Sequence, residues 1–225
     1  MEQYLTAIRS SWVDLCRLQM EREGHHYEFS STVLYYYSGL NLSILFQMKI
    51  AITQRQTIIN GITYDCLEPG WYRLFNQHKV IIVPNLIYVD LDVDMLVLSG
   101  GDLSKDRSQT ELACYNYASD HHIPVLGVCH GAFVINYLHG GLNKEISGHR
   151  NVMHSVEMEK QIHVVNSYHD IGIHTLGDDL ECIATNEGSI EAFKHKTRPQ
   201  WGILWHPERM EDPVLPAELK ELING

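Results

Sequence analysis

The sequence predicts an α/β protein built as a three-layer sandwich, with a mainly parallel central sheet, helices on both faces, and added antiparallel strands in the C-terminal half. Two observations support this prediction. From Met48 onward, short apolar runs alternate with amphipathic stretches, as in parallel strands joined by crossover helices. Beyond about residue 155 the runs become shorter and alternate in polarity, with glycine or asparagine between them, which is typical of antiparallel strands.

Each element follows from its own stretch of sequence. The predicted parallel strands are four apolar runs, at residues 49–53, 80–84, 94–98 and 124–128. Residues 69–77 and 110–121 are predicted helices, and the first opens with a proline, which is tolerated at the start of a helix. The predicted antiparallel segments are residues 155–165, 180–186, 189–196 and 202–206. A last short helix is expected to begin near Pro216.

The first 47 residues do not fit this scheme. Apolar residues recur there at helical spacing, at Leu5, Ile8, Trp12, Leu15 and Leu18. The apolar stretch that follows is too short and too interrupted to span a bilayer. We therefore predict an N-terminal extension over residues 1–47 and a single domain over residues 48–225. Two alternatives stay open: the extension packs on the domain, or the functional unit begins at Met48.

Composition excludes several classes of function. The formal net charge of −11 argues against a nucleic-acid partner, because phosphate contacts need lysine and arginine gathered on one face. Five cysteines without paired spacing, and no secretory leader pattern, predict a cytoplasmic protein with no membrane partner. Fourteen histidines invite a metal interpretation, but H-E-x-x-H and C-x-x-C are both lacking. We predict no metal site and no cofactor.

Cys129 stands in the segment GVCHG, residues 127–131, where a predicted strand turns into a helix. Such a sharp turn needs glycines around it, because side chains there would collide with neighbouring backbone. A turn of this kind is typical of a nucleophile elbow. The free amides and the dipole of a helix N-terminus would favour thiolate over thiol. The alternative is an ordinary buried cysteine near a turn. Cys129 is therefore a candidate nucleophile that needs a base.

The segment WHPE, residues 205–208, supplies the candidate base. His206 and Glu208 are two residues apart, so on an extended chain both side chains point the same way. The proline between them keeps His206 extended, which lets the carboxylate orient the imidazole. Cysteine, histidine and an orienting acid have the logic of a catalytic triad. The alternative is that His206 merely ends an edge strand.

The segment SGGD, residues 99–102, directly follows a predicted parallel strand. Its glycines, Gly100 and Gly101, allow a bare backbone amide to face the site. Together with the amide of His130, that group could hold a developing oxyanion. Sites of α/β proteins collect at the carboxyl ends of strands, which places this segment beside the cysteine.

Taken in order, SGGD, GVCHG and WHPE resemble the class I glutamine amidotransferase superfamily, and more closely its γ-glutamyl hydrolase branch. The resemblance covers about residues 48–210 and makes residues 48–225 a catalytic domain. It implies Cys129 as nucleophile, His206 as base and Glu208 as the orienting acid. It also implies that amides near Gly101 and His130 form the oxyanion hole.

Two further stretches are similar to that branch. "DRSQTE" lies where such hydrolases carry an R-D-x-x-E segment, and "NSYHD" looks like the segment that lines the γ-glutamyl pocket through backbone groups. The substrate-binding residues implied in this way are Arg107, Glu111, Ser167, Tyr168 and His169.

Three stretches bear on the leaving group of the substrate. Many glutaminase modules read C-x-G-x-Q, whereas Phe133 takes the place of that glutamine here. "KIAITQR" and "GWYRLF" are similar to a subgroup that cleaves γ-glutamyl-CDP-amidate in capsular polysaccharide phosphoramidate biosynthesis. Arg55 falls just past the first strand, where a guanidinium could pair with a diphosphate. This resemblance implies a γ-glutamyl nucleotide as the small-molecule substrate.

The expected activity is cysteine-dependent hydrolysis of a γ-glutamyl amide through a γ-glutamyl thioester, releasing glutamate. Two alternatives keep the same chemistry: a glutaminase subunit that supplies ammonia to a separate synthetase, and a γ-glutamyl-amine hydrolase of polyamine breakdown. Two others change it: a cysteine-type α/β-hydrolase, and a non-catalytic binding domain that kept the fold. The sequence leaves the oligomeric state open, with a homodimer among the alternatives.

Overall fold

The computed structural model describes residues 47–86 and 91–225, and all structural statements below refer to these residues. The predicted N-terminal extension lies outside them except for its last residue, so the boundary near Met48 stays a prediction.

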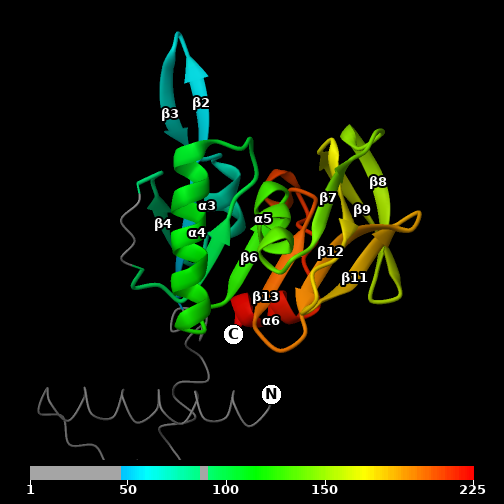
Figure 1. Ribbon diagram of the computed structural model, residues 1–225. Coiled ribbons are helices and arrows are strands. Elements are labelled where there is room, and N and C mark those ends of the chain that lie inside the picture. Colours follow the sequence, from blue (N-terminus) through cyan, green and yellow to red (C-terminus); the bar gives the residue numbers. More distant parts are fainter. Residues whose placement is uncertain (1–46, 87–90) are drawn as a thin grey trace, which may run out of the picture. The chain divides into compact units, whose positions relative to one another are not determined.

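A nine-stranded sheet forms the centre of the described part, in the order β4-β1-β5-β6-β13-β12-β11-β8-β9 (Figure 1). Its parallel half consists of β1 (Lys49–Thr53), β4 (Lys79–Val83), β5 (Met95–Leu98), β6 (Val125–Val128) and β13 (Gln200–Ile203). Every residue of β5, β6 and β13 is buried. The continuous apolar runs predicted this, since parallel strands are covered on both faces.

The other half of the sheet is antiparallel and consists of β8 (Arg150–Met158), β9 (Gln161–Tyr168), β11 (Leu180–Asn186) and β12 (Ser189–His195). The C-terminal region is thus antiparallel as predicted, with one difference. β13 pairs antiparallel with β12 but parallel with β6, so it joins the two halves of the sheet. A separate small sheet pairs β7 (Leu142–Glu145) with β10 (Ile171–Thr175).

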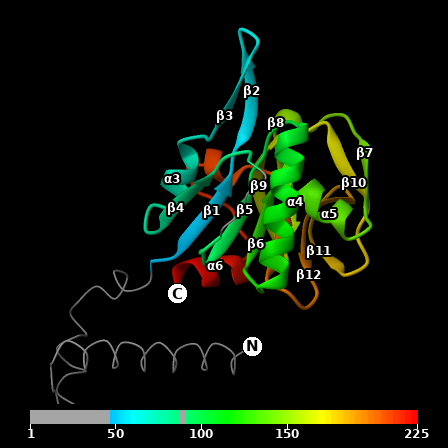
Figure 2. The same cartoon turned by 60° about the vertical axis from the view of Figure 1, so that its left-hand side comes forward.

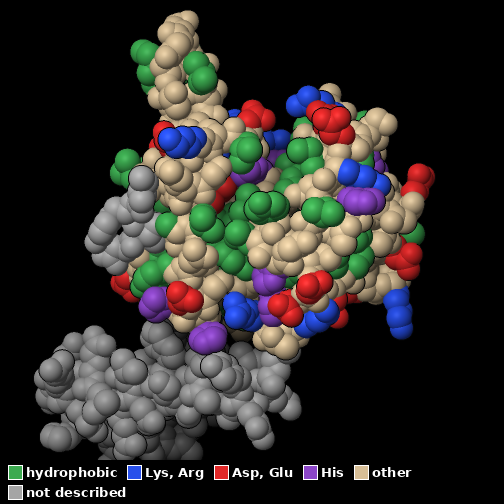
Figure 3. Space-filling view, viewed as in Figure 1, with side chains coloured by type: hydrophobic (Ala, Val, Ile, Leu, Met, Phe, Trp, Pro, Cys, Tyr) green, Lys and Arg blue, Asp and Glu red, His purple; other side chains and the backbone are tan. Residues whose placement is uncertain are grey.

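A hairpin that the sequence analysis did not predict projects beyond the sheet (Figure 1). It consists of β2 (Arg55–Ile59) and β3 (Ile62–Cys66), joined at Asn60 and Gly61, which both have positive φ. Asn-Gly between two strands favours this tight turn and was the signal available in the sequence. Apolar side chains are exposed on the hairpin (Figure 3), namely Ile58, Ile59, Ile62 and Tyr64.

Helices cover both faces of the sheet, as predicted. α4 (Lys105–Asp120) and α5 (His130–Leu138) lie on one face, and α3 (Gly70–Leu74) and α6 (Ala217–Asn224) on the other (Figures 1 and 2). α4 begins five residues before its predicted start because the Ser104 side chain accepts a hydrogen bond from the Arg107 amide and caps the helix.

Among the described residues, no helix combines the length and the apolar character that crossing a membrane requires.

The N-terminus of α5 lies unusually close to the strands beneath it. A Cβ placed on Gly131 would lie 2.1 Å from the carbonyl oxygen of Leu98 in β5. One placed on Gly127 in β6 would lie 2.6 Å from the backbone of Gly131. Both glycines are therefore required by close backbone approach, which brings Cys129 to the edge of the sheet.

Gly131→Ala should lower the free energy of unfolding by about 1–3 kcal/mol, because the new methyl group must displace the backbone of β5. Urea denaturation followed by circular dichroism measures this loss. Gly172→Ala is the matched control: its Cβ would meet only the flexible side chain of Ile146, at 3.0 Å. Equal losses in the two variants would contradict this explanation of the glycine.

Candidate active site

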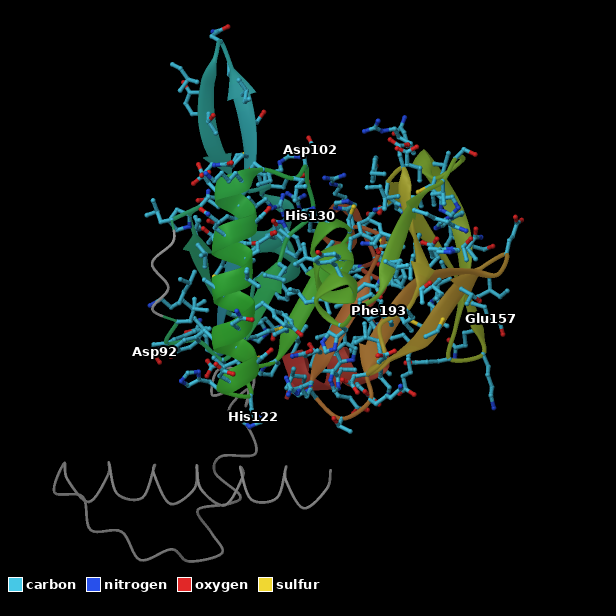
Figure 4. All side chains as sticks on the ribbon, in the orientation of Figure 1. Asp92, Asp102, His122, His130, Glu157 and Phe193 are labelled. Atoms are coloured by element: carbon cyan, nitrogen blue, oxygen red, sulfur yellow. The ribbon has the colours of Figure 1, made fainter. Side chains whose placement is uncertain are left out.

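The three motifs meet at the carboxyl ends of β5, β6 and β13, which are neighbours in the sheet. The Cys129 amide donates to the carbonyl oxygen of Ile203, at 2.8 Å, and so ties the end of β6 to that of β13. A Cβ placed on Gly100 would lie 2.3 Å from Cε1 of His206, so the SGGD turn packs directly against the imidazole. Figure 4 shows Asp102 and His130 at this same end of the sheet.

Cys129 has the strained backbone of a nucleophile elbow. It is the N-cap of α5, with φ 49° and ψ −103°, and positive φ is uncommon for any residue with a side chain. Its side chain is buried, since the residue is 8% exposed. The strain is held in place by the tight packing of Gly127 and Gly131 on either side.

The environment of the Cys129 sulfur opposes its ionisation. Burial raises the pKa of the thiol to about 11, although the His130 amide and the charges of Arg209 and Arg107 act in the opposite direction. Burial thus works against the thiolate that the helix N-terminus favours. A thiol whose pKa is raised needs a base to become a nucleophile.

His206 and Glu208 form a buried pair beside this cysteine. His206 Nδ1 lies 2.6 Å from Glu208 Oε1, and both residues are less than 5% exposed. His206 is extended, as predicted, and the short 3₁₀ turn η2 (Pro207–Arg209) then carries the carboxylate back to the ring. With the hydrogen on Nδ1 donated to Glu208, Nε2 is the nitrogen that can accept a proton.

Asn166, in the edge strand β9, holds His206 and was not among the predicted site residues. Its Nδ2 donates to the carbonyl oxygen of His206 at 2.9 Å, and its Oδ1 accepts from the His206 amide at 2.8 Å. Asn166 therefore holds both polar groups of the His206 backbone, the amide and the carbonyl. The signal was present in the sequence, because Asn166 opens the NSYHD segment.

Arg107 and Glu111 brace the site from within α4. Both side chains are fully buried, and Arg107 Nε donates to Glu111 Oε1 at 2.9 Å. The Arg107 guanidinium also donates to the carbonyl oxygens of Ser99, Gly100 and Asp102. Glu111 Oε2 accepts from Nε2 of His130, at 2.9 Å. These two side chains therefore hold the SGGD turn and the start of α5 in one arrangement.

The charge of Glu111 is maintained despite its burial. Burial alone would raise the pKa of this carboxyl group, but the hydrogen bond from His130 and the charge of Arg107 outweigh it, so the pKa is lowered. An ionised Glu111 can accept hydrogen bonds from Arg107 and His130 at the same time. A protonated carboxyl group has fewer free acceptor positions and would do so less well.

Arg209 and Glu68 form a second ion pair next to the imidazole. Arg209 donates twice to the Glu68 carboxylate, at 2.8 and 2.6 Å. The guanidinium carbon of Arg209 lies 4.7 Å from the ring centre of Tyr168, and that ring meets His206 edge-on with centroids 5.6 Å apart. Nothing in the sequence around Glu68 indicated this role.

Arg55 lies at the rim of the same cluster, at the start of β2. Its Nη1 is 3.2 Å from Glu68 Oε1, and its side chain is 40% exposed. A Cβ placed on Gly101, which has φ 131°, would lie 2.8 Å from Cβ of Arg55. The structure thus brings this arginine next to the SGGD turn, with part of its guanidinium open to solvent.

The NSYHD segment faces two ways. Tyr168 lies against His206, whereas the Ser167 hydroxyl donates to the carbonyl oxygen of His149. His169 is buried and packs edge-on against Phe133, with ring centroids 6.0 Å apart. The side chains of Ser167 and His169 are thus engaged in packing, and a role in substrate binding through their backbone groups stays a prediction.

Comparisons with known proteins agree on the family. The family model of peptidase C26 matches residues 92–208, which contain all three motifs. A γ-glutamyl-CDP-amidate hydrolase of Campylobacter jejuni is 33% identical over 186 residues, which cover 72% of this chain and 90% of that protein. A subunit of the glutamine-hydrolysing GMP synthase of Thermoplasma acidophilum is 36% identical over 142 residues, 56% of this chain and 70% of that one.

The fold has the same relatives. A solved structure of a putative GMP synthase subunit from Thermoplasma acidophilum superposes with a TM-score of 0.62 at 23% identity, covering 80% of this chain and 94% of that one. The predicted resemblance is therefore confirmed. The chain belongs to the peptidase C26 family of class I glutamine amidotransferase-like proteins and is a hydrolase that acts on carbon–nitrogen bonds.

Proposed function

We propose that this protein hydrolyses γ-glutamyl-CDP-amidate, releasing glutamate and the nucleoside diphosphoramidate, in the synthesis of a capsular polysaccharide phosphoramidate. The observation that carries the proposal is the placement of Arg55, partly exposed, near a cysteine, a histidine and a glutamate at the ends of the neighbouring strands β6 and β13. The Campylobacter relative supports it, because the similarity extends over 90% of that protein.

The first half of the proposed reaction forms a γ-glutamyl thioester. Cys129 Sγ attacks the γ-carbonyl carbon while its proton moves to Nε2 of His206. Because burial raises the pKa of the thiol, we expect attack and proton transfer to be coupled. The amides near Gly101 and His130 would stabilise the oxyanion as it forms. The His206 proton then passes to the departing nitrogen, and the carbon–nitrogen bond breaks.

The second half hydrolyses the thioester. Neutral His206 accepts a proton from water, the resulting nucleophile attacks the acyl carbon, and the sulfur leaves and regains its proton. Glu208 stays ionised throughout, fixing the ring through Nδ1 and stabilising the imidazolium in both halves. Glutamate is released, and the thiol is restored for another cycle.

Arg55 is proposed to bind the diphosphate of the leaving group. Its Nε has no hydrogen-bond partner among the described residues, and its outer nitrogens reach only Glu68. A planar guanidinium can donate two parallel hydrogen bonds to a phosphate group. Arg209 adds positive charge nearby but is already paired twice with Glu68. Arg55 is therefore the better candidate for a ligand.

A second candidate function is that of a glutaminase subunit that passes ammonia to a separate synthetase. The specific observation in its favour is the similarity to a subunit of a glutamine-hydrolysing GMP synthase. Against it stands Phe133, which lies one helical turn beyond Cys129, where many glutaminases carry glutamine.

Glutamate release from a panel of substrates tests the proposed function. The value of kcat/KM for γ-glutamyl-CDP-amidate should exceed those for glutamine and γ-glutamylputrescine by about 100-fold, since two phosphates add charge-assisted contacts. A kcat/KM for glutamine as high as that for γ-glutamyl-CDP-amidate would favour the glutaminase subunit instead. So would glutamine hydrolysis that rises when a synthetase is added.

Cys129→Ala should reduce kcat by about 10⁶-fold, and Glu208→Gln by about 10³- to 10⁴-fold, because the amide mistunes the imidazole without removing it. Steady-state glutamate release measures both losses. Cys182→Ala replaces an exposed free cysteine and serves as the control that keeps full activity. A larger loss for Glu208→Gln than for Cys129→Ala would contradict the assigned roles.

Arg55→Ala should raise KM for γ-glutamyl-CDP-amidate by about 10- to 100-fold, because a charge-assisted phosphate contact is lost. The same variant should leave KM for γ-glutamylputrescine, which has no phosphate, within about twofold of the unchanged protein. Arg73→Ala, which removes an exposed arginine of α3, is the matched control. An unchanged KM for γ-glutamyl-CDP-amidate would contradict the proposal that Arg55 binds the diphosphate.

A further inference from the structure

Three histidines and one carboxylate converge in the antiparallel half of the sheet, apart from the catalytic residues. His149 precedes β8, His154 lies within it, His169 follows β9, and Glu191 belongs to β12. Nδ1 of His149 is 3.3 Å from Glu191 Oε1, and Nε2 of His154 and of His169 are 3.5 and 3.7 Å from Oε2. Residues up to 42 positions apart in the chain thus point at one carboxylate.

The polar atoms at the centre of this cluster are buried without partners. The side chains of Glu191 and His169 are 1% and 2% exposed, and those of His149 and His154 are 13% and 12% exposed. Among the described residues, neither oxygen of Glu191 and none of the three facing nitrogens has a hydrogen bond. Burying a carboxylate and three imidazoles in this way is costly unless something binds between them.

The distances favour a metal ion over direct hydrogen bonds. A hydrogen bond from imidazole to carboxylate would bring nitrogen and oxygen to about 2.7–2.9 Å, shorter than all three distances here. Ligands held about 2.0–2.1 Å from a tetrahedral Zn²⁺ ion are separated from one another by about 3.3 Å. His149 Nδ1 and His154 Nε2 lie 3.3 and 3.5 Å from oxygens of Glu191, and the ligand atoms of these three residues are all within 4.8 Å of one another.

His169 lies beside this group rather than within it. Its Nδ1 donates to the carbonyl oxygen of Ile171 at 2.7 Å, and its Nε2 faces Glu191 Oε2 at 3.7 Å. Its position next to the carboxylate lets it orient Glu191 from outside the ion, as neighbours of metal-bound carboxylates do.

We propose that His149, His154 and Glu191 bind one Zn²⁺ ion. Three protein ligands leave the fourth tetrahedral position to a water molecule. No metal was predicted from the sequence because these ligands are not at the short fixed spacings of H-E-x-x-H or C-x-x-C. They come instead from β8, from the residue before it, and from β12.

The proposed ion would fix a wall of the active site. It would tie β12 to β8, which pairs with β9 along the NSYHD segment. That segment contains Asn166, which clamps the backbone of His206, and Tyr168, which packs against its ring. Phe133, one turn beyond Cys129, packs on the ring of His169. Removal of the ion should therefore loosen His206.

A second cluster in the described residues provides an internal contrast. His139, Asp179 and His195 also come within metal-binding range of one another. However, Asp179 is exposed, Nε2 of His139 bonds to the Tyr115 hydroxyl, and Nδ1 of His195 accepts from two backbone amides. One nitrogen of each histidine already has a partner and the carboxylate is open to solvent, so Asp179→Asn is the matched control.

The test is metal binding by the full chain, free of any affinity tag. Chelator-treated protein should take up one equivalent of Zn²⁺ in competition with a chromophoric chelator, and one equivalent of Co²⁺ with the visible absorption of tetrahedral coordination. Glu191→Gln and His154→Ala should each weaken Zn²⁺ binding by about 100-fold or more, since each removes or neutralises a ligand. Asp179→Asn should bind as tightly as the unchanged protein.

The proposal is overturned if the wild-type protein takes up no Zn²⁺ at micromolar concentration. It is also overturned if Asp179→Asn loses Zn²⁺ binding while Glu191→Gln and His154→Ala both keep it. Because the wild-type titration is decisive, the test stands even if a variant fails to fold. Zn²⁺ binding is measured without any substrate. Failure of the proposed hydrolysis would therefore leave the zinc site standing, and failure of Zn²⁺ binding would leave the proposed hydrolysis standing.

Discussion

The contact on which the site depends is the approach of α5 to the ends of β5 and β6. A side chain at Gly131 or Gly127 would collide with backbone, and with neither present the helix starts directly at the edge of the sheet. That approach forces Cys129 into its positive φ, directly after the end of β6. Every other site residue is arranged around this turn, since β5 and β13 flank β6 on either side.

Burial sets the chemistry that this arrangement can perform. The same packing that creates the elbow raises the pKa of the Cys129 thiol, so in the proposed mechanism the sulfur depends on His206 for its activation. Charged groups near it are held by opposite charges, as Glu111 is by Arg107 and Glu68 by Arg209. Such pairs fix the charges of the site in advance, which favours stabilisation of charge as it develops.

The NSYHD segment connects the two features described above. Alternate residues of a strand point to opposite sides, so Asn166 and Tyr168 reach His206 while Ser167 and His169 turn toward His149 and Glu191. One strand end therefore supports the proposed catalytic base on one side and the proposed zinc site on the other. A bound ion that fixes the histidine cluster would therefore also fix the position of His206, through the backbone of residues 166–169.

The sequence by itself determined the parallel strands, the antiparallel C-terminal half and the three motifs, because each depends on local patterns: continuous apolar runs, alternation, and glycines at a turn. It missed the β2–β3 hairpin although Asn60–Gly61 signalled it. Only the tertiary structure decided the pKa of Cys129, the clamp from Asn166, the ion pairs of Glu68 and the gathering of histidines around Glu191. Burial and contacts between distant strands create these features, and neither quantity is encoded in any one stretch of sequence.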